Sequence, residues 1–126
     1  MAGTAITRIT GSMDLYGPNR SASVNFLTCH DGFTLYDLYS YNYKHNEKNG
    51  WDNTDGDNNS HSWNCGEEGE TENVEIDSLR RRMIKNAFAT LMCSRGAAMF
   101  LAGDEFCNSQ NGNRTRALEV YSFFIT

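Results

Sequence analysis

The most constraining feature of the sequence is a long helical pattern that runs directly into a continuous apolar segment. Apolar side chains recur every three or four positions from Ile76 to Leu91, with Asn73 before them as a helix cap and Gly96 after them as a stop. Residues 97–102 are all apolar, which is typical of a strand buried on both faces. The pattern therefore predicts a helix followed at once by a buried strand.

A second buried strand is predicted at residues 23–29, followed by a short helix within 33–43. Together with the later helix and strand, this order predicts a βαβ unit in an α/β fold with a parallel sheet. Parallel sheets place their chemistry at the carboxyl ends of the strands. The polar residues that follow the two strands are therefore candidate site residues: His30, Asp31, Asp104 and Glu105.

Residues 44–74 form a very polar segment that predicts a long loop. Loops of this length are usually functional or disordered, and the presence of Trp51 and Trp63 favours a functional loop. Either tryptophan would stack on a ligand or pack beneath the loop, and the sequence leaves both interpretations open.

Composition excludes several classes of protein. The chain of 126 residues carries a net charge of -5, which argues against nucleic acid as a partner, and its one basic run, Arg80 to Arg82, is interpreted as a charged helix face. Neither a membrane-length apolar stretch nor a signal-peptide pattern is present, so we expect a soluble, cytoplasmic protein. Four cysteines without a CxxC pair favour reduced thiols.

Metal sites and cofactors are not expected. Numbered from Asp55 as an EF-hand, the acidic stretch has Ser60 and Gly66 where glycine and glutamate are needed. His45 and His61, taken with Cys65, match no common zinc spacing. A calcium site of another kind is the alternative that these arguments leave open.

Separated motifs carry a resemblance to a known family. They are Asn25 to Leu35 (NFLTCHDGFTL), Lys44 to Asn46, Ser62 to Gly66, Leu79 to Arg82 and Leu101 to Phe106. In order and spacing they resemble bacterial glycogen debranching enzymes of the isoamylase type, within the α-amylase clan of glycoside hydrolases. The resemblance covers about residues 5–112.

The resemblance implies a partial (β/α)8 TIM barrel containing strand seven, a long loop, helix seven and strand eight. It also implies hydrolysis of α-1,6-glucosidic branch linkages in glycogen or limit dextrin by a retaining mechanism. In this family the nucleophile and the general acid/base come from strands four and five, which have no counterpart here. We therefore expect the chain alone to be inactive.

By the same resemblance, Asp31 is the transition-state stabiliser and His30 binds the same sugar. Trp63 and Asn64 are implied substrate-binding residues, whereas Asp104 and Glu105 support the site without performing the chemistry. Without the resemblance, His30 and Asp31 would be interpreted as a strand-end pair that caps a turn.

The resemblance ends near residue 113. We expect 1–113 to be the barrel portion and 114–126 a non-matching tail from a frameshift, a misjoined fragment or a truncated reading frame. Apolar residues in the tail have no evident partner, which predicts aggregation. The alternatives to a debranching-enzyme fragment are a stand-alone glucan-binding or interaction module, and a barrel half that complements a separately encoded half.

Overall fold

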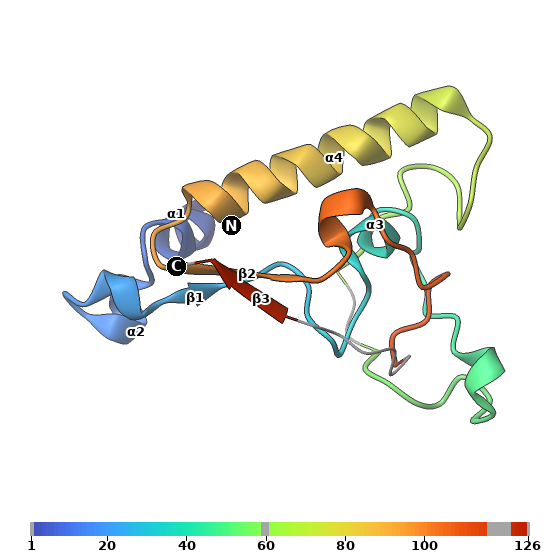
Figure 1. Cartoon of the computed structure of the whole chain (residues 1–126), viewed down its shortest axis with the longest axis horizontal. Helices are drawn as coiled ribbons and strands as arrows, with labels where there is room; N and C mark the ends of the chain where they lie inside the picture. The colour runs from blue at the N-terminus through green and yellow to red at the C-terminus, as the bar shows by residue number, and fades with distance from the viewer. Residues whose placement is uncertain (1, 59–60, 116–121, 126) are drawn as a thin grey trace.

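A computed structural model describes residues 2–58, 61–115 and 122–125. The chain forms a small sheet beneath one long helix, with most of its loops gathered at one end (Figure 1). The elements are α1 (Ala2–Ile9), α2 (Met13–Tyr16), η1 (Arg20–Ala22), β1 (Val24–Asn25), α3 (Leu35–Leu38), η2 (Glu47–Asn49), α4 (Val74–Cys93), β2 (Ala97–Leu101), η3 (Asp104–Phe106) and β3 (Ser122–Ile125).

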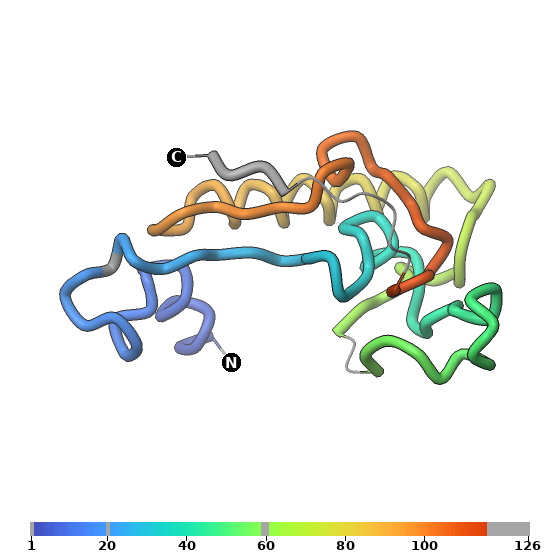
Figure 2. The backbone as a smooth tube through the Cα atoms, turned by 60° about the horizontal axis from the view of Figure 1, so that its bottom comes forward, coloured from blue at the N-terminus to red at the C-terminus, as the bar shows by residue number. Residues whose placement is uncertain are grey.

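The predicted parallel strand pair is confirmed. β1 pairs with β2 in parallel, with Val24 opposite Ala97, although the paired part of β1 is shorter than the predicted 23–29. Figure 2 shows the chain on both strands running side by side toward the loop-rich end of the molecule. The segments that follow the two strands, 30–33 and 103–106, therefore begin at the same end.

The predicted long helix is confirmed as α4. The Asn73 side chain accepts hydrogen bonds from the backbone N–H groups of Glu75 and Ile76, which satisfies two of the unpaired donors of the first turn. Its 20 residues give a length of about 30 Å, so α4 reaches from α1 to the loop-rich end. The short predicted helix within 33–43 is present as α3, with Thr34 as its cap.

The interpretation of Arg80 as part of a charged helix face is wrong. Arg80 is fully buried, on the same face of α4 as Ile84, Ala87 and Leu91. Its position four residues before Ile84 places it in the buried stripe of the helix. Arg80 thus faces the interior, where its guanidinium needs polar partners.

The apolar core is small and lies between α3 and α4. Leu35, Ile84 and Ala87 form its buried centre, and five partly buried residues pack around them: Tyr36, Leu38, Tyr39, Phe88 and Cys107. The solvent-accessible surface area of the chain is 8233 Å², compared with roughly 6,800 Å² expected for a compact chain of this mass. The fold is therefore more open than a compact domain of equal size.

The prediction that the first strand is buried on both faces is wrong. Val24 is 49% exposed and Phe26, just beyond β1, is 52% exposed. Within the described part of the chain, β1 has a neighbour on one edge only, because the order in the sheet is β1-β2-β3. Its apolar side chains therefore lack the second layer and second strand that would cover them.

Part of the tail has a partner in the structure, contrary to expectation. The backbone of β3 pairs antiparallel with β2, with Ile125 opposite Ala98 and Ser122 opposite Leu101. The apolar positions 120 and 121 lie outside the described residues. The boundary at residue 113 and the origin of the tail stay predictions.

Replacing Gly96 by alanine should destabilise the strand pair. Gly96 has φ +125°, and an added Cβ would lie 2.2 Å from the backbone oxygen of Ser23, which accepts the Ala97 N–H. We expect Gly96→Ala to lower the free energy of unfolding by about 2 kcal/mol or more, measured by urea titration. Gly3→Ala is the control, because no atom lies within 4 Å of its added Cβ; equal stability losses in both variants would contradict the prediction.

Candidate functional site

His30 and Asp31 lie together on the turn that follows β1. His30 Nε2 is 3.1 Å from Asp31 Oδ2, and the two side chains are 69% and 77% exposed. The pair lies at the carboxyl end of a parallel strand, where the sequence places it. A carboxylate and an imidazole in this arrangement offer acceptors and a donor to a ligand that approaches from solvent.

Asp31 also lines a cavity of about 200 Å³. Phe33 forms part of its wall, and His61 and Arg114 reach it from the long loop and from the far end of the described chain. The Arg114 guanidinium lies 4.9 Å from the centre of the Phe33 ring. Sequence reasoning missed Arg114, because no spacing rule links a residue in the tail to a strand end eighty positions earlier.

Asp104 ties the two strand ends together. Its buried carboxylate accepts hydrogen bonds from the Thr28 hydroxyl at 2.7 Å and from the backbone N–H groups of Leu35 at 2.8 Å and Leu101 at 3.2 Å. Burial raises the pKa of Asp104 above its ordinary value, and these donors only partly offset it. Glu105, by contrast, is exposed and accepts only the N–H of Gly103.

A second buried carboxylate, Asp37, organises the loop after η3. It accepts hydrogen bonds from the Ser109 hydroxyl at 2.6 Å and from the N–H groups of Gln110 at 2.8 Å and Gly112 at 3.3 Å. Burial raises its pKa as well, against the effect of these donors. Sequence reasoning missed Asp37, whose only local signal is its place three residues after the helix-capping Thr34.

Arg80 holds the second half of the long loop. Its guanidinium donates to the backbone oxygens of Asn64, Glu67 and Gly69, so its buried charge meets carbonyl oxygens. The loop from Asn64 to Gly69 is thereby fixed to α4 at three backbone oxygens. The helical spacing of Arg80 with Ile84 is the signal that predicts its burial.

The side chain of Asn64 is used inside the loop. Its amide donates to Glu68 at 3.0 Å and its oxygen accepts the Gly66 N–H at 3.0 Å. Glu68 also accepts the N–H groups of Asn42 and Tyr43; although burial opposes them, these donors hold the pKa of Glu68 below its usual value. The implied role of Asn64 in substrate binding stays a prediction.

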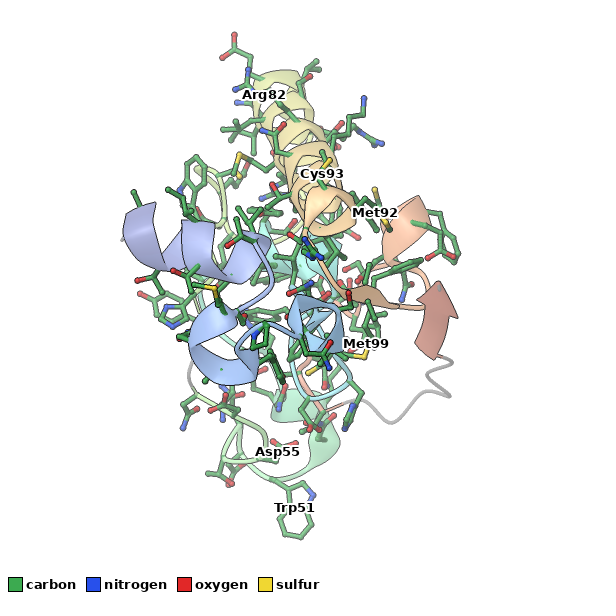
Figure 3. The ribbon with its side chains drawn as sticks, turned by 90° about the vertical axis from the view of Figure 1, so that its left-hand side faces the viewer. Trp51, Asp55, Arg82, Met92, Cys93 and Met99 are labelled. Carbon is green, nitrogen blue, oxygen red and sulfur yellow. The ribbon has the colours of Figure 1, made fainter. Side chains whose placement is uncertain are left out.

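The two tryptophans differ in their surroundings. Trp63 is 49% exposed, and its backbone N–H donates to the carbonyl of Leu38. Trp51 is 69% exposed and projects from the tip of the loop (Figure 3). An exposed ring at a loop tip favours stacking on a ligand over packing beneath the loop.

The described residues contain neither a cluster of metal-ligating side chains nor a helix able to span a membrane. Across residues 2–58, 61–115 and 122–125, no group of three or more His, Cys, Asp or Glu side chains is arranged to hold a metal ion. In the same part of the chain, none of the helices has the length and apolarity needed to cross a membrane.

Comparison with known proteins identifies relatives that are much longer than this chain. It is 54% identical over 114 residues to the "Glycogen operon protein GlgX homolog" of Mycobacterium tuberculosis, covering 88% of the chain and 16% of that protein. It is 50% identical over 116 residues to "Isoamylase 3, chloroplastic" of rice, covering 90% and 15%. A "Glycogen debranching enzyme" of Erwinia tasmaniensis is 49% identical over 109 residues, covering 84% and 17%. No family model matches the chain.

Replacing Asp104 by asparagine should loosen both strand ends. The asparagine NH₂ group would face one of the groups that now donate a hydrogen bond to the carboxylate. That buried donor would then have no acceptor. We expect Asp104→Asn to lower the free energy of unfolding by about 1–3 kcal/mol in urea titration at neutral pH. Glu105→Gln, at the exposed neighbour, should change it by less than about 0.5 kcal/mol. An equal effect of both variants would contradict the prediction.

The stability contributed by Asp104 should depend on pH. Because its pKa is raised in the folded state, the folded chain binds the proton more tightly than the unfolded chain. The proton-linked part of this contribution is fully present below the ordinary pKa of 3.8 and is lost as pH rises through the raised value, whereas the hydrogen-bonding part remains at neutral pH. The difference in free energy of unfolding between wild type and Asp104→Asn should therefore shrink from pH 4 upward. A difference that grows with pH would reverse the assigned sign.

Proposed function

Because the chain is homologous to a short segment of glycogen debranching enzymes and isoamylases, we propose that it serves in the hydrolysis of α-1,6-glucosidic branch linkages. The substrate would be an α-glucan such as glycogen or limit dextrin, acted on in the cytoplasm. The observation that carries this proposal is identity of about one half over most of the chain to proteins bearing these names. The exposed His30–Asp31 pair supports it.

We place β1 and β2 as strands seven and eight of a (β/α)8 barrel, with α4 as helix seven. The parallel pairing of β1 with β2 and the connection through α4 support this assignment. Site residues of such barrels come from the carboxyl ends of the strands, where the turn bearing Asp31 lies.

In this proposal Asp31 stabilises the transition state. As the sugar ring at the cleavage point flattens toward an oxocarbenium ion, the Asp31 carboxylate accepts hydrogen bonds from its hydroxyl groups. Such bonds strengthen in the transition state and contribute several kcal/mol. His30, 3.1 Å from Asp31, binds hydroxyls of the same sugar and orients the carboxylate. Trp63 and Asn64 are assigned to substrate binding, and Asp104 fixes the strand ends that carry the turn.

The chain alone should be inactive. A retaining glycosidase needs a nucleophile and a general acid/base about 5 to 5.5 Å apart across the scissile bond. The chain spans about one sixth of its relatives, and we assign those two carboxylates to the other five-sixths. Without them, binding contacts do not replace the double displacement.

A second candidate is a barrel half that works with a separate polypeptide. An apolar groove of about 410 Å³ runs between α1, α2 and β1. Ile6 and Leu15 on these helices are 62% and 67% exposed, and Val24 of β1 is 49% exposed. A free strand edge beside exposed apolar side chains is a surface suited to a further strand and helix.

A chimera tests the proposed role of Asp31. The matching segment of the Mycobacterium tuberculosis relative is replaced by this chain, and reducing ends released from glycogen are measured. We expect the chimera to be active and Asp31→Asn to lower kcat by roughly 10²- to 10⁴-fold, equivalent to the loss of several kcal/mol of transition-state stabilisation.

Lys85→Ala, at an exposed position of α4, is the matched control and should retain the activity of the chimera. Full activity of the Asp31→Asn chimera would refute the assigned role. Debranching by the chain alone would overturn the placement of the nucleophile outside it.

A further inference from the structure

We propose that a second cleft, distinct from the cavity beside Asp31, binds a stretch of α-1,4-linked glucan chain; this inference rests on the proposed function. The cleft has a volume of about 450 Å³, within the range of roughly 300–1,000 Å³ typical of small-molecule sites. Its floor is formed by Tyr41 and His45, and its walls by η2 and the turn 110–113. No residue lines both this cleft and the Asp31 cavity.

The walls of the cleft are held rigid by hydrogen bonds. Asp37 fixes the backbone of the turn at Gln110 and Gly112, and the carbonyl of Gly112 accepts the His45 N–H at 2.8 Å. The Asn113 amide donates to the side-chain oxygen of Asn49 at 2.7 Å, which connects the turn to η2. A ligand would therefore meet a cleft whose shape is already formed.

Gly112 allows the turn to lie directly on the floor. It has φ +73°, and an added Cβ would lie 2.8 Å from a ring carbon of Tyr41 and 2.9 Å from a ring carbon of His45. Tyr41 itself is 7% exposed and meets the His45 ring edge-on at 5.3 Å. The Tyr41 ring is therefore covered, and the His45 side chain, which is 40% exposed, is the part of the floor that a sugar can contact.

Three polar side chains at the cleft are available to a ligand. Lys48, Gln110 and Asn111 line it, and among the described residues none of these side chains makes a hydrogen bond within the chain. Each amide offers both donors and an acceptor, and the ammonium offers donors. Such a set matches neighbouring hydroxyl groups, which also donate and accept.

The charges at the cleft favour a neutral ligand. Glu47 and Lys48 are adjacent on the same wall and carry opposite charges. Their fields oppose each other, so neither an anion nor a cation gains the selective attraction that a one-signed site provides. Among ligands of the proposed function, the linear part of the glucan meets this requirement.

Binding of maltoheptaose to the full chain, measured by isothermal titration calorimetry, tests the proposal. We expect Gln110→Ala combined with Asn111→Gly to weaken Kd by about tenfold or more, as expected for the loss of one or two hydrogen bonds. Glycine at 111 retains the left-handed conformation, since Asn111 has φ 54°. Lys48→Ala changes only an exposed side chain and should weaken binding severalfold in a chain that folds normally.

Lys85→Ala is the matched control, because Lys85 is exposed on α4 and lines neither the cleft nor the Asp31 cavity. It should leave maltoheptaose binding within about twofold, and cellohexaose, a flat β-1,4 chain, should bind at least about tenfold more weakly than maltoheptaose. The proposed site would be refuted if the wild type did not bind maltoheptaose. It would also be refuted if Asp31→Asn abolished binding while the substitutions at Lys48, Gln110 and Asn111 left Kd unchanged. Neither result changes the expected debranching activity of the chimera. The chimera assay therefore tests the proposed function independently of this binding site.

Discussion

The carboxylate of Asp104 is the interaction on which the arrangement of the site depends. It accepts hydrogen bonds from Thr28 in the segment after β1, from Leu35 at the start of α3 and from Leu101 at the end of β2. Removing this carboxylate from water opposes its ionisation, yet its position lets one side chain satisfy donors on three separate segments. The turn bearing His30 and Asp31 lies between two of those segments, so its position follows from a buried polar contact.

Polar contacts also hold the loops that the small apolar core does not reach. Asp37 fixes the turn 110–113, and Arg80 fixes the loop from Asn64 to Gly69. A buried ion without its partners is expensive, so losing the donors around Asp37 or the acceptors around Arg80 would cost much more free energy than losing one surface contact. The loop-rich end is consequently preorganised for binding by hydrogen bonds, whereas α4 provides the frame.

The sequence predicts α3, α4 and β2, leaves α1, α2 and β3 unpredicted, and predicts the polar contacts poorly. Helical periodicity and the Asn73 cap identify α4, and the apolar run at 97–102 identifies β2. The expected burial of β1 fails because burial depends on neighbouring strands, which the sequence of one segment does not contain. The partners of Asp37 are missed because they lie more than seventy residues away, where no local pattern operates.

The two ends of the molecule consequently place different demands on a partner. At the end bearing α1, α2 and the edge of β1, apolar side chains are exposed, and their burial would be the main gain from association. At the loop-rich end, Asp37 satisfies backbone N–H groups of the turn 110–113, and the side chains that line the cleft beside this turn are mostly polar. On the proposed function, a sugar chain would bind there without further folding, whereas catalysis would need groups brought into place at the other edge of the sheet. Glucan binding and bond cleavage should therefore be separable, with binding retained in the isolated chain and cleavage regained only on assembly.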